Sequence, residues 1–206
     1  MSQWLARPGA VPSSTPVPVP EHARWWSYAQ ACAVAFRLGE APLEIDVFGP
    51  VLDHDECVYF SATAQYARLY GGDGSYTTNG FVAFGRPAVM AGALAASAYV
   101  NHRRKVAAKR EAVSRWRDQQ QSMVIGTSSR LMVNTVEHGW LSFYYSAVNE
   151  YVPDLPRWAL TLGFGSQCVP MQLVGPCVPA AAVLVSVALD PQRWWRDPRL
   201  GPLLTG

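Results

Sequence analysis

The chain has 206 residues and half of them are apolar, which suits one large folded domain or a domain with an extension and excludes a fully disordered chain. The net charge is only +2, so a polyelectrolyte role for the whole protein is not indicated. The charge is uneven, however, because seven basic residues and one acid lie between Arg103 and Arg117.

The N-terminal quarter predicts an arm, a helix and a strand. Residues 1–20 hold five prolines, which is typical of a disordered or polyproline-like arm. Residues 21–38 place apolar side chains three and four positions apart and predict a helix, which Gly39 ends. Residues 43–47 alternate apolar and acidic side chains and predict a strand, so residues 21–50 form an extension before the main domain.

The middle of the chain is expected to hold a long helix. Residues 58–70 fit either a helix or a bent pair of strands, and residues 75–84 predict a strand after a glycine-rich turn. Residues 88–121 contain no proline and one glycine, which favours one long helix. The apolar run Pro87–Val100 is shorter than the roughly 20 residues of a membrane-spanning helix. We expect a buried helix there, and the alternative is a shallow membrane insertion anchored by the basic flank.

Beyond residue 122 the apolar side chains alternate with a period of two. This pattern predicts short antiparallel strands at residues 123–125, 131–133, 140–145, 158–164 and 169–173. Pro179 suits the first turn of a final helix with one apolar stripe (Val183, Leu184, Val187 and Ala188), and residues 191–206 are expected to pack as an irregular strap. The predicted fold class is α+β: a small antiparallel curved sheet or barrel closed by the C-terminal helix, in a domain of residues 51–190 that carries the long helix as an insertion.

Two resemblances agree with this order of elements. The sequence Thr127-x-x-Arg130-Leu131, followed by W-L-S-F at residues 140–143, resembles bacterial pleckstrin-homology/GRAM-like domains, which implies a binding module. Residues 66–77 (YARLYGGDGSYT) and 101–117 are similar to an uncharacterised family of actinobacterial, phage or prophage proteins, over about residues 56–189. That family has no established activity, so the resemblance implies no catalytic residue.

No motif in the sequence indicates an enzyme. Residues 53–57 (DHDEC) hold five potential metal ligands, but consecutive positions in a strand point to opposite sides, and a polar turn is expected. Residues 71–75 lack the lysine of a phosphate-binding loop, and GxSxG is absent. We therefore expect no catalytic residue, metal, cofactor or small-molecule substrate. A hydrolase or transferase would need a pocket that gathers Asp73, His54 or His138.

Cysteine usage and the first residues suggest the compartment. The four cysteines form no CxxC pair, and residues 1–10 lack the basic start and apolar run of a signal peptide. We expect reduced thiols in a cytoplasmic protein. The alternative location is peripheral, at the inner face of the membrane.

The basic window is the strongest functional indication. On a helix its cations would lie on three sides and face an anionic partner: a membrane surface or an acidic protein. One alternative is a phage- or host-encoded regulator that binds nucleic acid, although no compact helix pair for reading DNA is evident. The other is a solvated face without a partner. The candidate binding residues are Arg103, Arg104, Lys105, Lys109, Arg110, Arg115 and Arg117.

Overall fold

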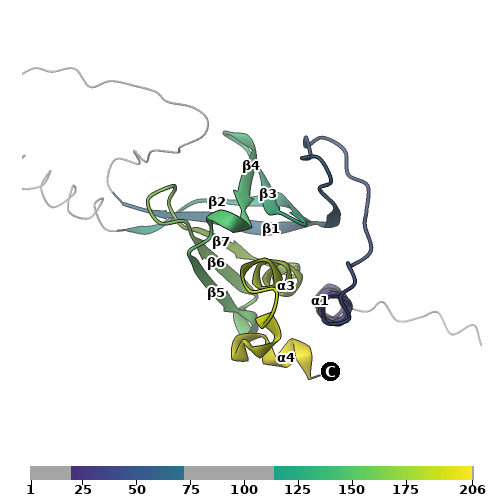
Figure 1. Cartoon of the computed structure of the whole chain (residues 1–206). Coiled ribbons are helices and arrows are strands. Elements are labelled where there is room, and N and C mark those ends of the chain that lie inside the picture. The colour runs from purple at the N-terminus through teal and green to yellow at the C-terminus, as the bar shows by residue number, and fades with distance from the viewer. Residues whose placement is uncertain (1–19, 72–113, 206) are drawn as a thin grey trace, which may run out of the picture.

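A computed structural model describes residues 20–71 and 114–205 of the chain (Figure 1). The predicted strand at 75–84, the apolar run 87–100, most of the long helix and nearly all of the proline-rich arm lie outside these ranges. The main elements are α1 (Glu21–Arg37), β1 (Val58–Tyr70), β2 (Arg115–Thr127), β3 (Arg130–Thr135), β4 (Gly139–Tyr144), β5 (Glu150–Asp154), β6 (Ala159–Gly163), β7 (Met171–Val174), α3 (Val178–Leu189) and α4 (Gly201–Leu204). In the described ranges, no helix combines the length and the apolar character needed to cross a membrane.

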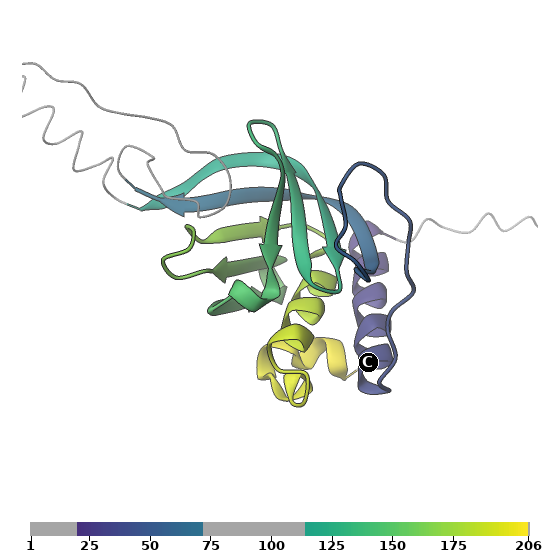
Figure 2. The ribbon, with the colours of Figure 1, turned by 45° about the horizontal axis from the view of Figure 1, so that its top comes forward.

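The seven strands form one antiparallel sheet in the order β4-β3-β2-β1-β7-β6-β5. The predicted α+β class with an antiparallel curved sheet is confirmed, but the sheet is open and does not close into a barrel (Figure 2). Its two edges are β4 and β5. Pro153 lies in β5, where an edge strand tolerates a residue that cannot donate to a neighbouring strand.

The two longest strands, β1 and β2, form the middle of the sheet. Residues 58–70, which fitted a helix or a bent strand pair, form one strand with two irregularities of register against β2. At the second irregularity, Tyr66 pairs with Gln120 and Arg68 with Arg117, so β2 carries an extra residue there. Asp118 lies in this bulge with a φ of 53°, a left-handed conformation that aspartate tolerates better than most residues.

The helix predicted to extend to residue 121 is wrong in its last part. Residues 115–121 belong to β2, and Trp116 pairs with Leu69 of β1. Glutamine and arginine are good helix formers, so this local sequence alone favours a helix. Hydrogen bonding to β1, which lies more than forty positions earlier in the sequence, overrides that preference.

The strand predicted at residues 43–47 is also wrong. Residues 38–57 form an irregular segment between α1 and β1, which we call the acidic loop, and the backbone N–H of Ile45 donates to the carbonyl of Val58. Val47 and Leu52 pack on Val58 and the rest of a small apolar cluster on the sheet, completed by Ile125, Met132 and Trp140. Of residues 43–47 only Val47 is partly covered, so their alternation does not mark one covered and one exposed face.

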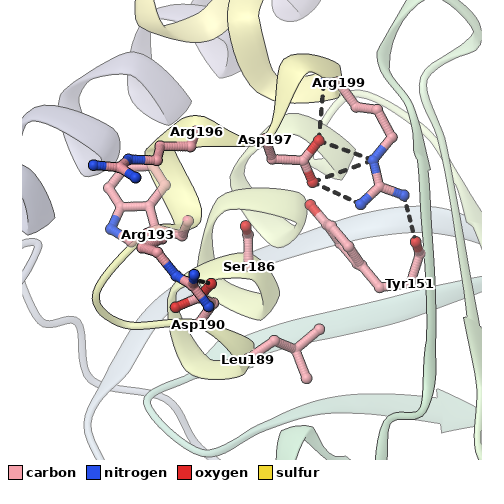
Figure 3. A pocket seen from close by; sticks show the side chains of 9 residues that line it. Tyr151, Ser186, Leu189, Asp190, Arg193, Arg196, Asp197 and Arg199 are labelled. Atoms are coloured by element: carbon pink, nitrogen blue, oxygen red, sulfur yellow. Dashed lines mark hydrogen bonds and ion pairs between the residues drawn. The ribbon is translucent and has the colours of Figure 1, made fainter.

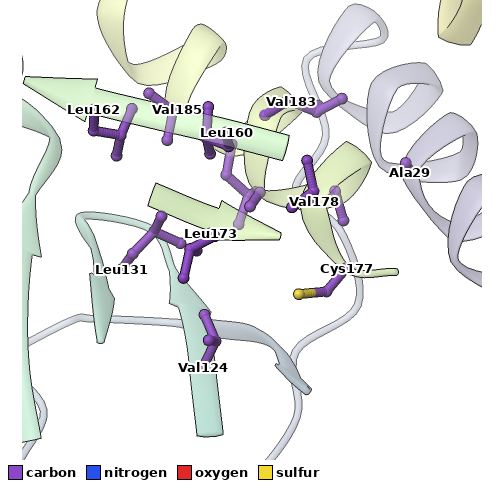
Figure 4. Close-up of a cluster of buried hydrophobic side chains, with 14 of the residues drawn as sticks. Ala29, Val124, Leu131, Leu160, Leu162, Leu173, Cys177, Val178, Val183 and Val185 are labelled. Atoms are coloured by element: carbon purple, nitrogen blue, oxygen red, sulfur yellow. The ribbon is translucent and has the colours of Figure 1, made fainter. Parts of the chain in front are cut away.

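The main core lies between the sheet, α3 and α1 (Figure 4). Residues 178–186 of α3 are buried on all sides, because the sheet covers one side of this helix and α1 and the C-terminal turns cover others. The prediction of a single apolar stripe on this helix is thus wrong in part: residues 178–186 are buried on every side, and Ala188, which was placed in the stripe, is exposed. Small side chains on both helices, among them Ala29 of α1 and Ala181 of α3, permit their close approach.

The predicted helix at residues 21–38 is confirmed as α1, which adds aromatic contacts to the core. Trp25 packs edge-on against Phe60 at 5.6 Å between ring centroids, and Phe36 packs in the same way on Tyr59. The C-terminal residues, expected to form an irregular strap, instead form short helical turns at Trp194–Arg196, Pro198–Leu200 and Gly201–Leu204. Their apolar side chains Trp194, Leu200 and Leu203 are buried.

Gly126 is required where β1 and β2 cross the core. It pairs with Phe60, whose buried ring occupies the space that a side chain at position 126 would need. We expect Gly126→Ala to lower the free energy of unfolding by about 1–3 kcal/mol, because the displaced ring has no other low-energy position. Urea unfolding measures the change. Gly201→Ala is the matched control, since a methyl group there meets no atom within 4 Å; equal stability of both variants would contradict the packing argument.

Candidate functional site

The far end of the β1–β2 pair forms a two-stranded ribbon that projects beyond its neighbours. Strand β7 pairs with residues 65–68 of β1, and β3 pairs with residues 123–126 of β2, so the ends at Tyr70 and Arg115 have no further strand beside them (Figures 1 and 2). Residues 72–113 connect these two ends. The last two basic residues of the window, Arg115 and Arg117, therefore lie near the tip of this ribbon.

Only Arg115 and Arg117 of the seven predicted binding residues fall in the described ranges. Both lie on β2 rather than on a helix, and Arg115 is exposed. The guanidinium of Arg117 lies 5.4 Å from the ring centre of Tyr70, and its Nε donates to the Tyr70 carbonyl at 3.3 Å. The Tyr70 hydroxyl donates to Asp118 at 2.8 Å, so polar contacts cross the ribbon near its tip. Arg103, Arg104, Lys105, Lys109 and Arg110 lie outside the described residues.

A second cluster joins the acidic loop to the sheet. Glu56 accepts a bidentate interaction from Arg130, with Nε–Oε1 and Nη2–Oε2 distances of 2.9 and 2.7 Å. Both side chains are almost fully buried, with exposed fractions of 1% for Glu56 and 7% for Arg130. The remaining guanidinium hydrogens reach the Val51 carbonyl, the Ser142 hydroxyl and the Tyr144 hydroxyl, so every donor of Arg130 has a partner.

The carboxylate of Glu56 is equally well partnered. It accepts from the hydroxyls of Thr127 and Ser129 and from the backbone N–H of Asp53. Burial alone would raise the pKa of Glu56, but the hydrogen bonds from Arg130, Thr127, Asp53 and Ser129 lower it to about 2. With all polar atoms paired and shielded from solvent, this cluster is suited to holding the loop in place rather than to chemistry.

The cluster explains the two motifs that the sequence presented separately. Residues 53–57, with five potential metal ligands, form the predicted turn before β1, and in the described parts of the chain no group of metal-binding side chains comes together. Thr127 and Arg130 of the T-x-x-R-L motif close the tight connection between β2 and β3, where the Thr127 hydroxyl accepts the N–H of Arg130 at 3.0 Å. Both motifs were visible in the sequence, but no sequence pattern indicated that Glu56 pairs with Arg130, which lies 74 positions away.

A shallow hollow of about 580 Å³ lies between β5, the end of α3 and the C-terminal turns (Figure 3). Asp197 binds Arg199 at 2.6 Å and Asp190 lies 3.4 Å from Arg193, so two of the three arginines here already have an acidic partner. Only Arg196 lacks one among the described ion pairs. The Tyr151 hydroxyl donates to the Ala182 carbonyl, and burial raises the pKa of this phenol. The hollow thus carries a net charge of +1 (three arginines, two aspartates).

The other reactive groups are dispersed. His54 and His138 each lie near an acidic neighbour in the chain, Asp55 and Glu137, and neither lines the hollow; Asp73 is outside the described residues. The four cysteines are unpaired thiols, of which Cys32 and Cys177 are buried. Burial raises the pKa of Cys177 to about 12, which keeps it protonated at neutral pH.

Comparison with known proteins adds no assignment: no model of a protein family matches the chain, and a search of the curated proteins finds no significant match.

Removal of one partner of the Glu56–Arg130 pair leaves the other charge buried and uncompensated. We expect Arg130→Met and Glu56→Gln each to lower the free energy of unfolding by about 3–5 kcal/mol. The double variant should lose clearly less than the sum of the two, because neither charge is then left alone. Urea unfolding of all four proteins gives the coupling energy, and strict additivity would show that the two side chains do not act as a pair.

The pKa of Glu56 also predicts how stability depends on pH. The folded-state pKa of about 2 lies below the value of about 4.3 for an unfolded glutamate, so the stabilisation is complete above about pH 5. It is lost as the pH falls from about 4.5 towards 2 and amounts to about 3 kcal/mol. Unfolding free energies of wild type and Glu56→Gln at several pH values should therefore converge in acid. Glu137→Gln, on an exposed turn, is the control and should follow the wild type; parallel curves for Glu56→Gln would refute the assignment.

Proposed function

We propose that this protein is a non-enzymatic binding module of pleckstrin-homology/GRAM-like type that engages an anionic membrane surface or an acidic protein through the basic residues at the tip of its β1–β2 ribbon. The observation that carries the proposal is the position of the basic window. Its last two basic residues, Arg115 and Arg117, lie on β2 where the β1–β2 pair projects from the sheet, and Arg115 is exposed at the end of the ribbon. A projecting element can reach a flat surface that the body of the sheet cannot approach as closely.

The remaining architecture supports a binding role. An open antiparallel sheet with a buried C-terminal helix against it agrees with the type that the T-x-x-R-L and W-L-S-F motifs suggest. Residues 72–113 carry six basic residues and two acids, and five of the basic residues follow one another closely between positions 103 and 110. Lysine and arginine near an anionic bilayer each contribute about 1 kcal/mol, so such a cluster is sufficient for reversible attachment.

Co-sedimentation of the full chain with vesicles tests the lipid form of this proposal. We expect binding to vesicles that contain anionic lipid, weak binding to neutral vesicles, and a decrease of at least about tenfold when Arg103, Arg104, Lys105, Lys109 and Arg110 are replaced by glutamine. The control replaces Arg157, Arg193 and Arg196, which are exposed elsewhere, and should bind like the wild type.

The same experiment separates the alternatives. Equal vesicle binding of the wild type and the glutamine variant would show that the basic window does not bind the membrane. Absence of vesicle binding would leave the acidic-protein form, and a gel shift with duplex DNA that weakens steeply in salt would favour the nucleic-acid regulator instead.

A further inference from the structure

The acidic loop presents large apolar side chains to solvent. Its inward residues Val47 and Leu52 pack on the sheet, whereas Leu43, Phe48 and Val51 have exposed fractions of 87%, 95% and 86%. Single exposed apolar residues are common on proteins, but three so completely exposed on one short segment form a surface that favours a partner. Figure 2 shows this segment as the dark blue loop at the end of the sheet opposite the ribbon tip.

The same loop is strongly acidic. Residues 38–57 contain six acids and neither lysine nor arginine. Glu56 is neutralised by Arg130, and Asp53 lies 3.7 Å from the same guanidinium. Glu40, Glu44 and Asp46 are exposed beside the apolar side chains. A partner that fits this surface must therefore be basic and must also offer apolar side chains.

The chain itself contains a segment with these properties. Residues 103–113 carry five basic residues and one acid, with Val106, Val113 and three alanines between them. We infer that the acidic loop of one molecule is the docking surface for residues 103–113 of a second copy of the protein. This inference rests on the proposed function and names the acidic protein face that the basic segment recognises.

For Lys109 and Arg110, the reach of the chain indicates a second copy rather than the same molecule. Six positions separate Lys109 from Arg115, and an extended chain of this length spans at most about 21 Å. The acidic loop attaches near the start of β1, and about 33 Å of strand lies between Phe60 and Tyr70. The Lys109–Arg110 part of the segment, fixed at Arg115 on the ribbon tip, consequently does not reach the loop of its own molecule.

The loop is preorganised for such a contact. The Val51 carbonyl, the Asp53 backbone and the Glu56 side chain are held by the Arg130 cluster, and Ile45 is held by its bond to Val58. A surface that is already ordered loses little conformational entropy on association, which favours binding. Because the loop and the basic segment are different surfaces, each molecule can both donate and accept, either in a closed pair or in a head-to-tail chain.

Sedimentation velocity of the full-length protein tests the inference. We expect concentration-dependent association at about 10–100 μM that weakens when the salt concentration rises from about 50 to 500 mM. Phe48→Ser should weaken it by at least about tenfold, since a fully exposed phenylalanine is available as the central anchor. The pair Glu44→Lys with Asp46→Lys and the pair Lys109→Glu with Arg110→Glu should each have an effect of at least that size.

The charge reversals provide an internal rescue. A chain that carries all four reversals restores the complementarity and should associate within about threefold of the wild type. Glu137→Lys with Glu150→Lys is the matched control, because it changes two exposed acids outside the loop and should leave association unchanged. A monomeric wild type at low salt, or association that neither reversal weakens, would overturn the inference. Since vesicle binding uses a different readout, its presence or absence is decided separately.

Discussion

The buried pair of Glu56 and Arg130 is the interaction on which the arrangement of the N-terminal half depends. It connects three parts of the chain: the acidic loop, the connection between β2 and β3, and the edge strand β4. Two charges that lose their water must recover that cost from each other and from neighbouring dipoles. Here both carboxylate oxygens and all guanidinium hydrogens find partners, so the geometry of the three parts is fixed together.

This constraint has a consequence for the surface of the molecule. With Glu56 and the Val51 carbonyl held by Arg130, the loop lies over the sheet with Val47 and Leu52 directed inward. The intervening side chains Phe48 and Val51 are left in solvent. The apolar surface therefore accompanies the way in which the charged pair anchors the loop.

The two functional proposals use opposite ends of the central strands. The last basic residues of the window lie where β1 and β2 run past their neighbours, and the acidic loop lies where β1 begins. The length of this strand pair keeps Arg115 and Arg117 away from the acidic loop of the same molecule. The long β1–β2 pair is thus both the centre of the sheet and the spacer between two surfaces of opposite charge.

The sequence by itself determined the α+β class, the helix at residues 21–37, four of the strands after residue 122 and the turn at residues 53–57. Each of these rests on a local pattern: apolar side chains at helical spacing, alternation, or clustered turn residues. It also located the basic window, though not its partner.

Only the tertiary structure decided the rest, because the deciding contacts join positions far apart in the chain. Residues 115–121 form a strand since β1 pairs with them, and Pro153 is accepted in β5 because that strand is an edge. Residues 43–47 form a loop that meets the sheet through the Ile45 N–H and the Val47 side chain. The partnership of Glu56 with Arg130 spans 74 positions, and no local propensity encodes it.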